Sequence, residues 1–179
     1  MKHLIFAMIA AFIAWSLPAH AADFQKGLLA AQKGDFATAL QEWQPLADEG
    51  NNHAQYSLGV MYYNGQGVSQ DYEMAVKWYR LSAEQGNPAA QTNLGVMYYS
   101  GKGVPQDSGV AVKWYKLATK QNFAFAQSNL GVMYFTGQGV EQDYTEAAKW
   151  YRLAAAQGNE NAKVKLERMY ENGQAKPEE

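Results

Sequence analysis

The residues with side chains suited to catalysis or metal binding are few and regularly spaced. Asp71, Asp107 and Asp143 recur every 36 residues, each just before an apolar helical pattern, and helix capping explains this placement. His53 is the only histidine beyond residue 21, and the chain has no cysteine. One histidine without convergent carboxylates is a poor metal site, and the motifs His-Glu-x-x-His and Gly-x-Ser-x-Gly are missing. The sequence therefore predicts no catalytic residue, no metal site and no cofactor, and hence a protein that is not an enzyme.

Glycines recur at two places in the same period. One group forms Gly-x-Gly between apolar helical patterns, which in a single copy could resemble a phosphate-binding loop. Three copies favour a turn instead. The other group lies inside helical patterns and favours a close approach of two helices, where a side chain would clash. The first group is Gly65, Gly67, Gly101, Gly103, Gly137 and Gly139, and the second is Gly59, Gly95 and Gly131.

Aromatic and basic residues also follow the period. Trp78, Trp114 and Trp150 each precede a tyrosine, and such a row could stack against a glycan. Their helical spacing beside alanines favours packing in the core instead. The same segments carry a basic row, which we interpret as a solvated face: Lys77, Arg80, Lys113, Lys116, Lys149 and Arg152.

Three blocks of nearly identical sequence define the period. LGVMYYNGQGV begins at Leu58, LGVMYYSGKGV at Leu94 and LGVMYFTGQGV at Leu130. Each block is followed by a second apolar pattern, so each unit is interpreted as two helices joined by the Gly-x-Gly loop. Neither helix can bury its apolar face alone, whereas stacked units share one continuous core. The sequence therefore predicts an all-α repeat solenoid.

The consensus of these units resembles a known repeat family. The pattern A-x-A-Q-x-x-L-G-V-M-Y-x-x-G-x-G-V-x-Q-D-Y-x-x-A-x-K-W-Y is similar to the Sel-1-like repeat, a relative of the tetratricopeptide repeat, over residues 52–172. The resemblance implies a right-handed α/α solenoid that serves as an adaptor for protein complexes. Many bacterial members are exported and are linked to envelope functions or host interaction. Penicillin binding or hydrolysis has been attributed to cysteine-rich relatives, and the lack of cysteine here weakens the transfer of that activity.

The repeat and the resemblance together divide the chain into segments. We expect a cleavable signal peptide at 1–21, a tetratricopeptide-like helix pair at 22–51, and Sel-1-like repeats at 52–87, 88–123 and 124–159. A capping helix at 160–172 and a disordered tail at 173–179 complete the prediction. Glu42 stands in the first pair where later units have tryptophan, so this pair departs from the repeat pattern.

The first 21 residues have the pattern of a secretory signal. A short positive start is followed by 14 predominantly apolar residues, Leu4 to Leu17, which are too few for a bilayer that needs about 20. Pro18 and the small residues around His20 fit the end of the apolar region and a cleavage site after Ala21. We therefore expect a periplasmic protein, or alternatively a secreted one, without integral membrane contact.

A second stripe on the first helix of each unit is the candidate binding surface. Its members follow three- and four-residue steps and therefore share a face distinct from the Ala-Leu-Met stripe of the core. The resemblance implies that this face lines the concave groove of the solenoid. Aromatic, asparagine, serine and threonine side chains suit a peptide, while packing against the neighbouring first helix is the open alternative. The predicted binding residues are His53, Tyr56, Val60, Tyr63, Asn64, Thr92, Asn93, Val96, Tyr99, Ser128, Asn129, Val132 and Phe135.

Composition limits the class of partner. Hydrophobic residues make up 47% and charged residues 18% of the chain, which is the composition of a folded domain. The formal net charge of -2 provides no basic excess for nucleic acid. The sequence thus predicts an exported scaffold that binds a protein or peptide in its groove. A module for glycan or peptidoglycan fragments, associated with the cell wall, is the alternative, and a hydrolase is the less favoured one.

Overall fold

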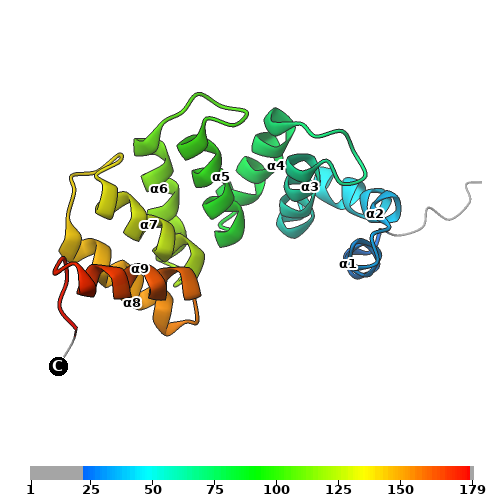
Figure 1. The fold of residues 1–179 in the computed structure, drawn as a ribbon. Coiled ribbons are helices and arrows are strands. Elements are labelled where there is room, and N and C mark those ends of the chain that lie inside the picture. Colours follow the sequence, from blue (N-terminus) through cyan, green and yellow to red (C-terminus); the bar gives the residue numbers. More distant parts are fainter. Residues whose placement is uncertain (1–21, 178–179) are drawn as a thin grey trace, which may run out of the picture.

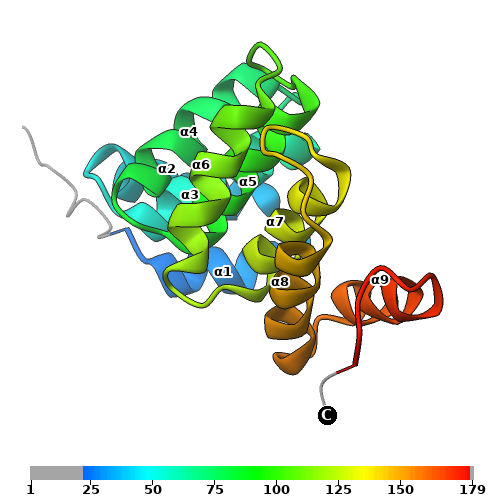
Figure 2. The same ribbon diagram turned by 90° about the vertical axis from the view of Figure 1, so that its left-hand side faces the viewer.

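The computed structural model describes residues 22–177 as a stack of helix pairs. In this part of the chain there are nine α-helices and no strands, which confirms the all-helical solenoid. Figure 1 shows the stack bent into an arch with α1 and α9 at opposite ends, and Figure 2 shows it from the side. None of these helices is both long and apolar enough to cross a membrane. The helices are α1 (Phe24–Gln32), α2 (Phe36–Asp48), α3 (Asn52–Asn64), α4 (Tyr72–Glu84), α5 (Pro88–Ser100), α6 (Ser108–Thr119), α7 (Ala124–Thr136), α8 (Tyr144–Ala156) and α9 (Glu160–Glu171).

The odd-numbered helices are the first members of successive pairs, and the even-numbered helices are the second members. The first helices α3, α5 and α7 each pack against the second helix of their own pair and of the preceding pair, while α1 packs on α2 and α9 on α8. The helix α7 also approaches α5 and α9, more closely than successive second helices approach each other. The first helices therefore line the inner side of the bend.

Helix starts follow the capping signals of the sequence. Asp71, Asp107 and Asp143 each accept a hydrogen bond from a backbone N–H in the first turn of the following helix, as predicted. Asn87 caps α5 in the same way. Phe123 takes the equivalent position before α7 and offers no side-chain cap. The start of α7 is therefore the weakest of these helix ends.

The core runs along the whole stack. Each first helix from α3 to α9 contributes an alanine, a leucine and a methionine to it, and in α5 Ala90, Leu94 and Met97 are at most 1% exposed. The second helices contribute the buried rings of Tyr79 and its repeats. This arrangement confirms the Ala-Leu-Met stripe as the core face and explains why it recurs unchanged in each unit.

The helical glycines lie where those tyrosine rings cross them. A Cβ atom on Gly95 would lie 2.5 Å from Cε1 of Tyr115, which is far below an ordinary carbon–carbon contact. The equivalent distances are 2.5 Å from Gly59 to Tyr79 and 2.7 Å from Gly131 to Tyr151. The prediction of a close helix–helix approach is therefore confirmed, and the partner is an aromatic ring on the second helix of the same unit.

The tryptophans join neighbouring units. Trp78 of α4 is buried within a core cluster formed by α1, α2 and α3, while Trp114 and Trp150 pack, partly buried, against the clusters that precede them. These rings are packing groups, as predicted. Glu42 replaces the tryptophan in α2, where the described chain offers no preceding pair for an indole to contact.

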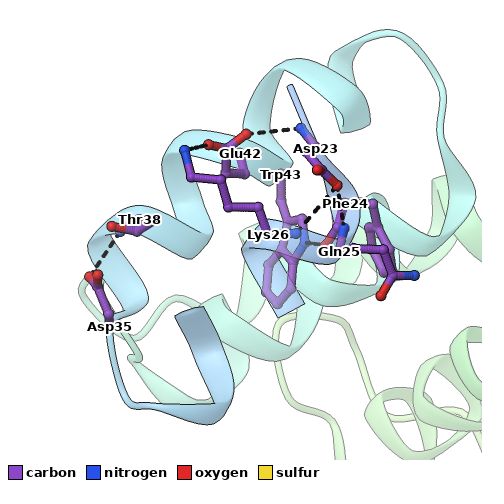
Figure 3. A network of polar contacts seen from close by, with 8 residues as sticks. All are labelled: Asp23, Phe24, Gln25, Lys26, Asp35, Thr38, Glu42 and Trp43. Carbon is purple, nitrogen blue, oxygen red and sulfur yellow. Dashed lines mark hydrogen bonds and ion pairs between the residues drawn. The ribbon is translucent and has the colours of Figure 1, made fainter. Parts of the chain in front are cut away.

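Glu42 is buried and is held by polar contacts instead (Figure 3). Its carboxylate accepts a hydrogen bond from the backbone N–H of Asp23 at 2.9 Å and pairs with the ammonium group of Lys26. The adjacent Trp43 donates from Nε1 to the carbonyl oxygen of Phe24 at 3.2 Å. These contacts join the start of α1 to α2. They also explain why Glu42 can be buried, because a buried carboxylate is tolerated only when it is paired and hydrogen-bonded.

Two predicted terminal segments have different outcomes. The signal peptide predicted for residues 1–21 lies outside the described residues. The predicted disordered tail needs correction over residues 173–177, because Gln174 N–H donates to the carbonyl of Met169 at 2.9 Å. Arg152 Nη2 also donates to the carbonyl of Lys176 at 2.6 Å. This part of the tail is therefore a turn folded back on the last two helices.

Candidate functional site

Six of the predicted binding residues line one pocket between α3 and α5. The pocket has a volume of about 290 Å³. Its floor includes the ring of Tyr79 from α4, which the sequence analysis assigned no role in binding. The recurrence of this tyrosine every 36 residues in the motif KWY could have pointed to a role in the pocket, but the same recurrence is expected of a core residue. The lining consists of Tyr56, Val60, Tyr63 and Asn64 from α3, Tyr79 from α4, and Asn93, Val96 and Met97 from α5.

The side chains that line this pocket are all uncharged, and the nearest cation is Lys102, which bonds the hydroxyl of Tyr63. Burial raises the pKa of the Tyr56 and Tyr79 hydroxyls above the ordinary tyrosine value, and the side chain of Asn93, which interacts with both, offsets part of each rise. Both phenols therefore stay protonated at neutral pH. With Asn93, they offer donors and acceptors beside an apolar wall made by Val60 and Val96. Such a lining can hold an apolar side chain and bond a peptide group.

Two further pockets occupy equivalent places along the stack. One lies between α1 and α3 and has a volume of about 210 Å³. There Trp43 takes the place of Tyr79, and Val60 the place of Val96. The other lies between α7 and α9, has a volume of about 170 Å³, and contains Phe135 and Tyr151. These three hollows lie at equivalent places of the repeat, and we call them together the inner groove.

Tyr63 of the pocket and its repeat equivalent Tyr99, which lines none of the three pockets, are tied to loops of the next unit. Tyr99 donates from its hydroxyl to Oε1 of Gln138 at 2.7 Å, and Lys102 donates from Nζ to the hydroxyl of Tyr63 at 3.1 Å. Gln138 and Lys102 are the middle residues of their Gly-x-Gly loops. Sequence reasoning treated these loops as turns only, although the repeated position of the middle residue was visible.

The close fit of these loops also explains their glycines. Gly103 has a φ of +67°, and a Cβ atom there would lie 2.3 Å from the carbonyl oxygen of Tyr72 in the preceding unit. Only glycine combines this backbone conformation with so close a contact. The prediction of a turn is thus confirmed, and the turn additionally packs one unit on the next.

The remaining predicted residues do not all face the groove. Thr92 and Ser128 are buried, at 4% and 7% exposure, and the Thr92 hydroxyl donates to the carbonyl of Pro88 in its own helix at 2.7 Å. Their assignment to an open binding face is therefore corrected. Asn129 and Val132 are partly buried, and Val132 packs against the last core cluster. His53 is exposed and its ring lies 6.0 Å from that of Phe24.

The basic row on the second helices has partners. Arg80 donates to the hydroxyl of Tyr98 at 2.7 Å, and Arg152 donates to that of Tyr170 at 3.2 Å. Lys116 lies over the ring of Tyr134, 5.7 Å from its centroid. These three tyrosines repeat every 36 residues on the first helices of the following units. The row therefore helps to join successive units.

The described residues contain no cluster suited to metal binding. No group of three or more histidine, aspartate or glutamate side chains comes together between residues 22 and 177. The three aspartates that recur with the period are occupied as helix caps.

Known proteins share this architecture. A family model for the Sel1 repeat matches residues 52–87, 88–123 and 124–159, which together are more than half of the chain. Among solved structures, the chain is similar to a protective antigen present in uropathogenic Escherichia coli strains that displays an SLR fold. The two are 41% identical, with a TM-score of 0.79, over 84% of this chain and 33% of that one.

A second similar structure is a Sel1 repeat protein from Oxalobacter formigenes. It is 34% identical, with a TM-score of 0.78, over 85% of this chain and 63% of that one. The chain thus spans about a third of the first relative and less than two thirds of the second. Since the matched repeats, the identities and the stacked helix pairs all agree, the chain belongs to the Sel1-repeat family.

Proposed function

We propose that this chain is an exported adaptor whose inner groove binds an extended peptide segment of a partner protein, in the cell envelope or at contact with a host. Sel1-repeat proteins are generally protein-interaction scaffolds. The observation that carries the proposal is the pocket between α3 and α5, which combines an apolar wall with the neutral polar groups of Tyr56, Tyr79 and Asn93.

The repetition of the pockets favours an extended ligand. Hollows at equivalent positions between α1 and α3, α3 and α5, and α7 and α9 can each accept one side chain of a single segment. Binding spread over several small pockets suits a peptide, because each anchored side chain adds buried area while the backbone bonds the polar groups between them.

The glycan alternative loses its main structural support. A sugar platform requires exposed aromatic faces, whereas Trp78 is only 5% exposed and belongs to the core. Trp114 and Trp150 also pack against core clusters. The rings that line the inner groove belong to tyrosines, Phe36, Trp43 and Phe135, and none is a tryptophan of the repeated row.

Export is proposed from the pattern of the first 21 residues, in the periplasm first and as a secreted protein second. The similar protein from uropathogenic Escherichia coli is a protective antigen, which supports a location accessible from outside the cell. That relative is about three times as long as the match, so its function is carried over only as part of this proposal.

Peptide selection tests the groove directly. Residues 22–179 would be immobilised and used to select binders from a random peptide library displayed on phage, and the affinity of selected peptides would be measured by fluorescence anisotropy. Val96→Glu places a carboxylate in the apolar wall of the pocket, and we expect it to weaken binding at least about tenfold, since an unpaired buried charge is costly.

A matched variant controls for folding and net charge. Leu117 is 40% exposed on α6 and lines none of the three groove pockets, so Leu117→Glu should leave affinity within about twofold. The proposal is rejected if peptides bind Val96→Glu as tightly as wild type, or if only muropeptide fragments bind and no peptide does.

A further inference from the structure

The pocket between α7 and α9 differs in charge from the one between α3 and α5. Applying the 36-residue period twice relates the two, so that Tyr63 corresponds to Phe135 and Tyr79 to Tyr151. Met97 in the first pocket likewise corresponds to Met169 in the second. All of these residues line their respective pockets. The two sites therefore share two aromatic positions and a methionine, whereas the valines of the wall line only the pocket between α3 and α5.

The two remaining equivalent positions change from neutral to cationic. Lys165 occupies the position that Asn93 has in the pocket between α3 and α5, and Arg168 occupies the position of Val96. They are three residues apart on α9 and therefore project from the same face, one turn from each other. The amide of Asn172 lies one further turn along this face and lines the same pocket.

Neither cation is neutralised by the rest of the described chain. The side chains of Lys165 and Arg168 form no ion pair or hydrogen bond with any residue between 22 and 177, although Glu171 is one turn from Arg168 on the same helix. Lys149 differs from these two cations, since its ammonium group is paired with the carboxylate of Glu146 at 2.8 Å. Two unpaired cations at the edge of a hollow formed by Phe135 and Met169 make a site for an anion that carries an apolar group.

We propose that this pocket binds the terminal carboxylate of a peptide, with the apolar side chain of its last residue against Phe135 and Met169. The inference rests on the proposed function and deepens it, because it orients the ligand. Arginine bonds both oxygens of a carboxylate through its planar fork, and Lys165 adds a second charge. The carboxyl end then lies at α9, and the preceding residues extend toward the neutral pocket between α3 and α5.

Small probes test the pocket without knowledge of the natural ligand. N-acetyl-leucine carries the carboxylate and an apolar side chain, whereas N-acetyl-leucinamide has the same shape without charge. In nitrogen-15 NMR titrations of the full mature chain, we expect N-acetyl-leucine to shift signals of residues 165–172 saturably. Its affinity should exceed that of the amide by at least about tenfold, a modest ratio for loss of a charge-assisted contact.

The repeat supplies its own control variant. Lys165→Asn with Arg168→Val gives the pocket the chemistry of the one between α3 and α5, and both side chains are exposed, so the fold should be retained. This variant should lose the preference for N-acetyl-leucine over its amide. The reciprocal variant, Asn93→Lys with Val96→Arg, should gain a second set of shifts around α5.

The outcomes separate this inference from the proposed function. If the amide binds as well as the acid, or if inorganic phosphate shifts the same signals with equal affinity, the carboxylate assignment is wrong even when selected peptides still bind the groove. If selected peptides bind the double α9 variant and wild type equally, or if their amidation changes nothing, the orientation is overturned. Loss of all peptide binding to wild type would instead reject the proposed function.

Discussion

Replacing Gly95 with alanine tests the contact that recurs in each unit. An ideal Cβ atom there lies 2.5 Å from Cε1, 2.8 Å from Cδ1 and 3.1 Å from Cζ of Tyr115. Carbon atoms in contact are normally about 3.5–4.0 Å apart. The ring must therefore move by about 1 Å, or α5 and α6 must separate by a similar amount. Tyr115 is 2% exposed and belongs to a core cluster, so its ring can move only by displacing other core side chains.

Two opposing terms set the size of the effect. Overpacking of a rigid core costs about 1–3 kcal/mol. Alanine in a helix interior is favoured over glycine by about 1 kcal/mol, which offsets part of that cost. We expect Gly95→Ala to lower the free energy of unfolding by about 1 kcal/mol, and by no more than about 2 kcal/mol.

Gly109 provides the matched control. It lies in the first turn of α6, and the nearest atom to an added Cβ is Oδ1 of Asp107 at 3.3 Å. Gly109→Ala gains the same helical preference with little steric cost, so the two variants should differ by about 1–3 kcal/mol. Urea unfolding followed by circular dichroism measures both.

A double variant isolates the ring. In a Tyr115→Leu background the added methyl group should cost less, whereas in a Tyr115→Phe background the cost should persist, because the contacting atoms belong to the ring. The reasoning is refuted if Gly95→Ala is as stable as Gly109→Ala, or if the cost is unchanged when the ring is removed.

Four further outcomes are expected. Phe123→Asn should stabilise the chain by about 1 kcal/mol, because it supplies the cap that α7 lacks and Asn87 provides to α5; urea midpoints test this, and an unchanged midpoint contradicts it. Trp78→Ala should cost about 3–5 kcal/mol, since the indole joins two units; a loss below 1 kcal/mol would show that it is dispensable for packing. Burial raises the pKa of Tyr79, Tyr115 and Tyr151, so these phenols ionise at about pH 10 only in the unfolded state and stability should be full below that pH and fall above it. Urea midpoints at pH 8 and pH 11 would show this fall, and it should be smaller in Tyr79→Phe. The chain with its first 21 residues should be exported from Escherichia coli with Ala22 as its new N-terminus by mass spectrometry; an unprocessed product in the cytoplasm would reject the signal peptide.

The helices and the core could be predicted from the sequence because the interactions that specify them are local or repeated. Capping residues such as Asp107 act within one turn of themselves, and the Ala-Leu-Met spacing marks a buried face whatever covers it. The regular repeat also makes each position easier to interpret, since a position that must be small or apolar recurs every 36 residues. Gly95 illustrates this, although its contact with a tyrosine ring was not predictable.

The binding surface depended on how one unit is rotated against the next. Tyr56, Thr92 and Ser128 occupy the same repeat position, yet Tyr56 lines a pocket while the other two are buried. Sequence periodicity defines a face of one helix, but the neighbouring unit decides which edge of that face is covered. Side-chain size then changes how far each position reaches into the space that remains.

The sequence by itself determined that the chain is a stack of helix pairs with a continuous core, because short-range caps and a regular apolar period leave no other arrangement that buries the apolar faces. Only the tertiary structure brought Asn93 to the hydroxyls of Tyr56 and Tyr79, or placed Lys165 and Arg168 beside Phe135. These residues lie on different units, and their meeting depends on the angle between successive pairs. That angle is the sum of many interlocking contacts, and no single motif encodes it.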